Sequence, residues 1–205
     1  MSVFSTTNPF IKFLAKLADL VILNLLIVVF SLPIVTAGAA ITAGHYATLK
    51  LHRGEGYVIK NYWKSFRLNF AQSTVIWISY AIYIVLSVGV IFVFSKQNTL
   101  LAGRVQGGVV GLVIISLFLF SWIIPLQARF TNQIRVTVRN AIRFAFKYFL
   151  ITILMVIISL SPIVIALFIN IHFYTILFLF GASAPIYLCV KLYDKVFKAI
   201  EDNIF

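Results

Sequence analysis

The chain has 205 residues, of which 62% are hydrophobic and only 11% are charged, and its mean hydropathy is +1.05. A soluble domain is about 45–50% apolar and about 25% charged, so this composition excludes an ordinary soluble enzyme, a disordered tail and a secreted disulfide scaffold. The charge is lopsided, with 17 Lys and Arg residues against 5 Asp and Glu residues. In a membrane protein such an excess indicates anionic lipid at the cytoplasmic face, and no nucleic acid partner is expected.

Five continuous apolar stretches are long enough to cross a hydrocarbon core about 30 Å thick, which takes about 20 residues. They predict spans at residues 17–35, 73–94, 107–126, 149–168 and 173–190. Because the apolar runs are continuous and do not alternate, they predict helices and exclude membrane strands. The predicted fold class is all-α: one integral membrane domain over residues 1–205, a multi-pass helix bundle of the bacterial cytoplasmic membrane.

The orientation of this bundle is predicted from the positive-inside rule. The segments after the first and third spans and the C-terminal tail carry 13 Lys and Arg residues. The N-terminal segment and the segments after the second and fourth spans carry four. The richer side is expected in the cytoplasm. The N-terminus is therefore predicted outside and the C-terminus inside.

The two basic segments have the pattern of amphipathic helices. Aromatic residues recur every four positions in 61–70, and arginines recur every four positions in 134–147. The predicted opposing apolar arc of the second segment consists of Ile134, Val138, Ala141, Ile142, Ala145 and Phe149. Such helices lie in the inner headgroup layer, where each cation contributes about 1 kcal/mol near an anionic surface. They serve either as topology anchors that bind anionic lipid or as a docking surface for a cytoplasmic partner or anionic ligand. The candidate contacts are Arg53, Lys60, Lys64, Phe66, Arg67, Phe70, Arg129, Arg135, Arg139 and Arg143.

Polar chemistry within the spans is sparse. Asp19 is the one acid near a span, and we expect it at the outer interface, where water reaches it. His45 and His52 lack further ligands at metal-binding spacing, and both are expected in a solvated loop. No nucleophile motif or phosphate loop is present. We therefore expect no catalytic residue, no cofactor and no metal site, and Cys189 is expected to be a small packing residue.

Small residues mark two places of close packing. The segment 36–44 follows Pro33 and consists largely of Ala, Gly and Thr, which lets a helix or a substrate approach the backbone. Gly103, Gly107 and Gly111 stand four apart, a spacing that favours close helix contact and a homodimer.

The N-terminal third resembles the YesL family of bacterial membrane proteins, also known as domain of unknown function 624. The resemblance is carried by Asn24-Leu25-Leu26, Ser31 to Gly38, His45 to Lys50, Arg53-Gly54-Glu55, Lys64 to Ser73, Pro125 to Phe130 and Asn140-Ala141. It implies structural roles for Asn24, Pro33, Thr36, Gly38, Gly44 and Asn69, but no catalytic residues. Family members are often encoded beside carbohydrate-uptake systems, which implies an accessory role next to a sugar importer.

Three functions remain open. The first is a non-enzymatic accessory protein that binds a membrane transporter complex through its basic helices. The second is a small oligomeric transporter or channel subunit. This function is favoured by the prolines within the spans and by the small-residue segment. The third, a membrane enzyme, has the least support, because no acid is paired with a base in a motif.

Overall fold

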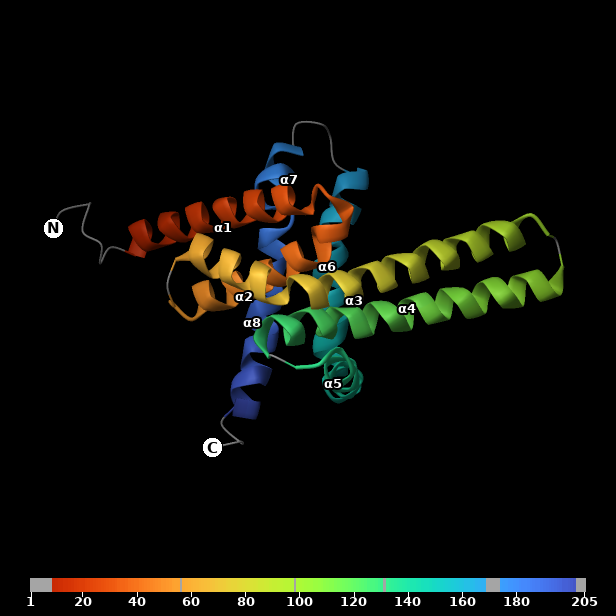
Figure 1. Ribbon diagram of the computed structural model, residues 1–205. Helices are drawn as coiled ribbons and strands as arrows, with labels where there is room; N and C mark the ends of the chain where they lie inside the picture. Colours follow the sequence, from red (N-terminus) through yellow and green to blue (C-terminus); the bar gives the residue numbers. More distant parts are fainter. Residues whose placement is uncertain (1–8, 56, 98, 131, 169–173, 202–205) are drawn as a thin grey trace.

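The computed structural model describes residues 9–55, 57–97, 99–130, 132–168 and 174–201, and every regular element among them is helical (Figure 1). The predicted all-α class is confirmed. The elements are α1 (Pro9–Ser31), η1 (Ile34–Thr36), α2 (Ala37–His52), α3 (Val58–Ser95), α4 (Leu100–Arg129), α5 (Ile134–Lys147), α6 (Phe149–Phe168), α7 (Tyr174–Phe180) and α8 (Ser183–Glu201).

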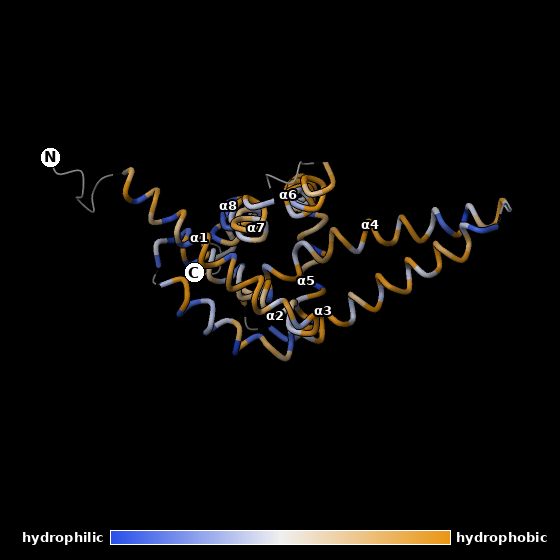
Figure 2. The backbone as a smooth tube through the Cα atoms, turned by 90° about the horizontal axis from the view of Figure 1, so that it is seen from above, coloured by the Kyte–Doolittle hydropathy of each residue, from blue (hydrophilic) through white to orange (hydrophobic). Residues whose placement is uncertain are grey.

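Four helices, α1, α3, α4 and α6, are long and apolar enough to span a membrane. The pair α7 and α8 passes the same test as one span that is bent by 51°. This pair covers the predicted fifth span except its first residue, Phe173, which lies outside the described residues. Helices α3 and α4 form a hairpin that extends far beyond the other elements, and α6 and α8 run across its base (Figure 1). The hairpin is hydrophobic along most of its length (Figure 2).

A buried helix, α2, lies in the segment that was predicted as a cytoplasmic loop. It runs back along α1 and α3, packs against α8, and 11 of its 16 residues are buried. Because protein and not lipid surrounds it, its surface is made of Ala, Gly and Thr instead of large apolar side chains. Span prediction by hydropathy misses such a helix for that reason.

The first basic segment is also not a separate helix at the headgroups. Residues 61–70 form the early part of α3, whose 38 residues extend about 57 Å at 1.5 Å per residue. The predicted span 73–94 is the later part of the same helix. The prediction of a separate surface helix here is wrong because nothing in the sequence between the two parts ends the helix: no Pro or Gly occurs from Val58 to Val88.

The N-terminal end of α1 lies beside the ends of α2 and α8. The Lys16 ammonium is 4.8 Å from the centre of the Tyr187 ring, and the His52 ring is 6.1 Å from that same ring. Because α2 returns along α1, the start of α1 and the start of α3 lie at one end of the molecule (Figure 1). This placement differs from the predicted orientation, which puts the N-terminus and Asp19 at the opposite end from the first basic segment.

Candidate functional site

The basic end of the molecule is organised around a buried acid, Asp194 on α8. Its side chain is 2% exposed, and its Oδ1 accepts hydrogen bonds from Arg53 Nη2 at 2.6 Å and Nε at 2.9 Å. Lys198 Nζ lies 3.2 Å from Oδ2, and His52 Nε2 lies 3.7 Å from it. Two donors of one guanidinium on a carboxylate oxygen form a charge-assisted contact, which is stronger than a hydrogen bond between neutral groups. Arg53, a predicted partner contact, therefore joins the end of α2 to α8 inside the protein.

The turn before α3 explains the motif Arg53-Gly54-Glu55. Gly54 has φ of +72°, the Gly54 N–H donates to Leu51 C=O, and the Glu55 N–H donates to Lys50 C=O. These two bonds form a Schellman motif, which ends α2 and needs a residue that tolerates positive φ. The Lys50 ammonium donates a hydrogen bond to the Glu55 carboxylate and thereby lowers the pKa of that carboxyl.

The aromatic residues of the first basic segment divide into core and surface. Phe66 is 8% exposed and packs in a ring cluster with Phe30 at 4.9 Å and Phe70 at 5.5 Å. The prediction of Phe66 as a partner contact is therefore wrong, because its side chain fixes α3 against α1. Lys60, Lys64, Arg67 and Phe70 are exposed, and the Arg67 guanidinium lies 5.0 Å from the Trp63 ring centre.

Helix α5 presents the predicted arginine stripe. Arg135, Arg139 and Arg143 are exposed, whereas Thr137, Ala141 and Ala145 are buried. The predicted apolar arc is wrong in two members. Ile142 is 40% exposed and shares the arginine face with Phe146 at 75%, and Phe149 is 51% exposed and belongs to α6. An exposed face that mixes arginine with large apolar side chains suits the headgroup layer or an amphipathic protein surface. Arg129, at the end of α4, is half-buried.

Two segments that carry the family resemblance meet in a polar network between α3 and α4. Gln127 Nε2 donates to Gln72 Oε1 at 2.6 Å and lies 3.5 Å from Asn69 Oδ1. Asn69 Nδ2 donates to Ser65 Oγ at 3.1 Å, and Gln72 Nε2 donates to the Asn132 carbonyl at 2.8 Å. Paired amides of this kind hold helices together where water is scarce. Asn69 thus has a structural role, and Gln72 and Gln127 are partners that the candidate residues from the sequence did not include.

Thr36, Gly38 and Gly44 are the predicted structural residues at the turn from α1 to α2 and along α2. The Thr36 hydroxyl donates to Phe30 C=O at 2.6 Å, a carbonyl in the last turn of α1, and lies 2.8 Å from Pro33 C=O. A Cβ on Gly38 would lie 2.4 Å from Trp77 Cβ and 2.6 Å from Ser73 O. Only glycine allows α2 to lie this close to α3. A Cβ on Gly44 would meet Ile27 at 2.7 Å, so this glycine allows the approach of α1.

Asn24 bonds to the break between α7 and α8. Its Nδ2 donates to Phe178 C=O at 2.7 Å, and its Oδ1 accepts from the Ala182 and Ser183 N–H groups at 2.8 Å and 3.0 Å. Backbone groups freed within a membrane must find partners inside the protein. Asn24 supplies three of these bonds from a different helix, which explains an asparagine within an apolar span.

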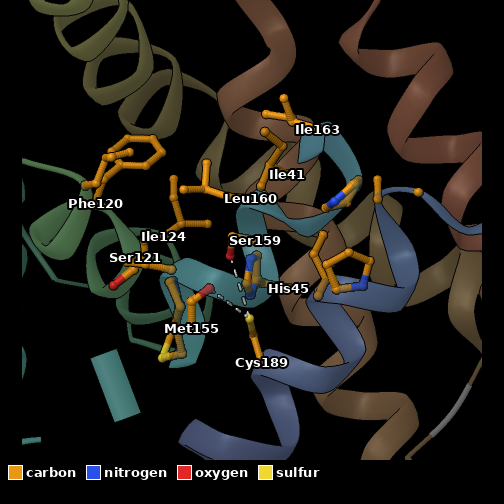
Figure 3. A pocket seen from close by; sticks show the side chains of 18 residues that line it. Ile41, His45, Phe120, Ser121, Ile124, Met155, Ser159, Leu160, Ile163 and Cys189 are labelled. Atoms are coloured by element: carbon orange, nitrogen blue, oxygen red, sulfur yellow. Dashed lines mark hydrogen bonds between the residues drawn. The ribbon is translucent and has the colours of Figure 1, made fainter. Parts of the chain in front are cut away.

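A cavity of about 350 Å³ lies between α2, α4, α6 and α8. His45, Ser159 and Cys189 converge on one wall, and Phe120, Ser121 and Ile124 line another (Figure 3). His45 Nδ1 is 3.2 Å from the Tyr193 hydroxyl, and Ser159 Oγ is 3.7 Å from Cys189 Sγ. The prediction of a solvated loop histidine is thus wrong for His45, since the helix α2 places it in the interior. The sequence feature that could have indicated this site is a histidine directly after the small-residue segment 36–44.

Four long apolar helices, together with a bent helix pair that passes the same test, define the class of multi-pass helical membrane proteins. Within the chain, residues 20–95 match the family described as "Protein of unknown function, DUF624", which confirms the family resemblance over α1, η1, α2 and α3. No curated protein and no solved structure matches the chain.

Proposed function

We propose that both termini of this protein lie in the cytoplasm. If the passes alternate in chain order and α2 is counted as a protein-enclosed return pass, α1, α3 and α6 are assigned as outward passes, and α2, α4 and the α7–α8 pair as return passes. Fifteen of the 17 Lys and Arg residues then fall on the inner side, and only Lys96 and Arg104, at the α3–α4 turn, fall outside. This distribution fits the positive-inside rule better than the 13 to 4 ratio of the five-span orientation.

The protein is, on this view, a non-enzymatic accessory component that docks to a membrane transporter complex through its inner face. The observation that carries the proposal is the exposed face of α5, where arginines alternate with Ile142 and Phe146. Arginine forks bind carboxylates in a bidentate manner, so the matching partner surface is acidic with an apolar centre. A subunit of a carbohydrate importer is the partner that the family resemblance implies. Anionic lipid is the competing ligand of this face.

Affinity purification in mild detergent tests the docking. The variant Arg135→Glu/Arg139→Glu/Arg143→Glu reverses the α5 stripe, and Lys96→Glu/Arg104→Glu reverses the cations at the opposite end. We expect a transporter subunit to co-purify in stoichiometric amount with the wild-type protein and the control, and not with the α5 variant. Recovery of no such subunit contradicts the proposal. Equal recovery with the α5 variant assigns the docking to a different face.

Cysteine labelling tests the orientation independently. Single cysteines at Lys12, Lys96 and Lys195 in a Cys189→Ala background are treated with an impermeant maleimide on intact cells. We expect labelling at position 96 alone. Labelling at position 12 contradicts the proposed orientation.

A small oligomeric transporter or channel subunit is the second candidate. The break between α7 and α8 beside the cavity favours it, because broken helices line the substrate sites of many transporters. Reconstituted vesicles that take up no sugar, oligosaccharide or ion would remove this candidate.

A further inference from the structure

We propose that the cavity between α2, α4, α6 and α8 binds an uncharged long-chain alcohol, with its hydroxyl between His45 and Ser159 and its chain along the apolar walls. The inference goes beyond the proposed docking function and uses none of the basic residues.

The shape and composition of the cavity indicate a chain. Its volume of about 350 Å³ lies in the range of sites for small molecules, roughly 300–1,000 Å³. Its walls are mostly Ile, Leu, Phe, Met and Pro side chains, and no Lys, Arg, Asp or Glu lines it. Ile163, one of its lining residues, is 61% exposed on the apolar surface of α6, so a chain can enter from the lipid. An ionised headgroup would lack a counter-charge here, which selects a neutral ligand.

The histidine provides a hydrogen-bond donor. Tyr193 is fully buried, and in the described part of the chain its hydroxyl has His45 Nδ1 as its hydrogen-bond partner. A buried O–H needs an acceptor, and Nδ1 is the acceptor available, so the Tyr193 hydroxyl donates and the proton of the neutral ring resides on Nε2. The Nε2–H group has no partner among the described side chains. It is therefore free to donate to a ligand oxygen.

The cavity also contains hydrogen-bond acceptors. An alcohol can both accept and donate a hydrogen bond, whereas an ester only accepts and an alkane does neither. The Ser159 hydroxyl, beside His45 in Figure 3, keeps lone pairs for a donating group. Pro125 has no N–H to offer the Ser121 carbonyl four residues earlier in α4, and Ser121 lines the cavity. A ligand hydroxyl can accept a hydrogen bond from His45 and donate one to an acceptor of the cavity, so it pairs with both.

Photolabelling of the full-length protein in phosphatidylcholine nanodiscs tests the proposal. The probes are hexadecanol and hexadecane that carry the same diazirine, and labelled peptides are mapped. One additional hydrogen bond of about 1 kcal/mol corresponds to about fivefold in binding, so we expect the alcohol to label α6 and α8 peptides about five times more than the alkane. Equal labelling by the two probes, or labelling spread equally over the α3–α4 hairpin, overturns the proposal without any variant.

Variants separate the hydroxyl site from the chain site. His45→Phe keeps a ring and removes the donor, and is expected to reduce the alcohol to the level of the alkane, while His52→Phe on the same helix retains the preference. Ser159→Leu fills the cavity and should reduce labelling by both probes, whereas Ser161→Leu should not. Gel filtration confirms that each variant is folded. Unchanged labelling in folded His45→Phe and Ser159→Leu proteins contradicts the assignment.

Competition identifies the source of the hydroxyl. Displacement by unlabelled hexadecanol alone indicates a free long-chain alcohol, and displacement by 1-palmitoylglycerol indicates a glycerolipid with a free hydroxyl. Displacement by neither overturns the proposal.

Discussion

Replacement of Asn24 by Ala removes the side chain that bonds to the break between α7 and α8. Three hydrogen bonds disappear, two from backbone N–H groups and one to a carbonyl. Hydrogen bonds between membrane helices average about 0.6 kcal/mol, and those in proteins generally about 1 kcal/mol. The expected loss of unfolding free energy is therefore about 2–3 kcal/mol. At about 2–4 °C per kcal/mol for a chain of this size, the melting temperature falls by about 4–12 °C.

The protein carries its own reporter for this measurement. Cys189 is the one cysteine of the chain and is 1% exposed, so a thiol-reactive fluorophore reports unfolding in detergent. Asn61→Ala is the matched control, since Asn61 Nδ2 makes one exposed bond of 2.9 Å to Glu55 C=O. We expect the control to melt within about 2 °C of the wild type. An Asn24→Ala protein that melts with the wild type, or a control that loses as much, refutes the reasoning.

Three further predictions use the same melting assay. Gly38→Ala places a Cβ 2.6 Å from a backbone oxygen that cannot move away cheaply and should lower the melting temperature, whereas Gly107→Ala, which meets open space, should not; equal effects would contradict the close approach of α2 and α3. Asp194→Asn removes the carboxylate that accepts two hydrogen bonds from Arg53 and should cost about 1.5–3 kcal/mol, which a wild-type melting curve would disprove. Because the hydrogen bond from Lys50 lowers the pKa of Glu55, that acid stabilises the fold above its ordinary pKa and this contribution is lost as the pH falls through the lowered value. Glu55→Gln should therefore reduce stability at neutral pH and show a weaker acid dependence, and identical pH profiles would contradict this.

The residues that carry the family resemblance make specific tertiary contacts in the structure. Asn24, Thr36 and Gly38 each have a specific partner in the fold: the α7–α8 break, the end of α1, and the Ser73 carbonyl with the Trp77 side chain. Asn69 and Gln127 lie 58 positions apart and share one network. Such pairings depend on tertiary contact, so a single sequence shows only that polar or small residues stand in unusual places.

Composition and hydropathy by themselves determined that this is an all-α membrane protein with long apolar helices, since lipid imposes the same demand on every exposed side chain and backbone group. They also located the α5 arginine stripe, because helical periodicity and charge are local properties. That α2 is a buried helix was decided only by the tertiary structure: a helix enclosed by protein carries Ala and Gly at its contacts, and hydropathy does not recognise it. With that helix counted as a return pass, our proposed orientation places 15 of the 17 Lys and Arg residues on one side. The cavity around His45 likewise exists only where four helices meet.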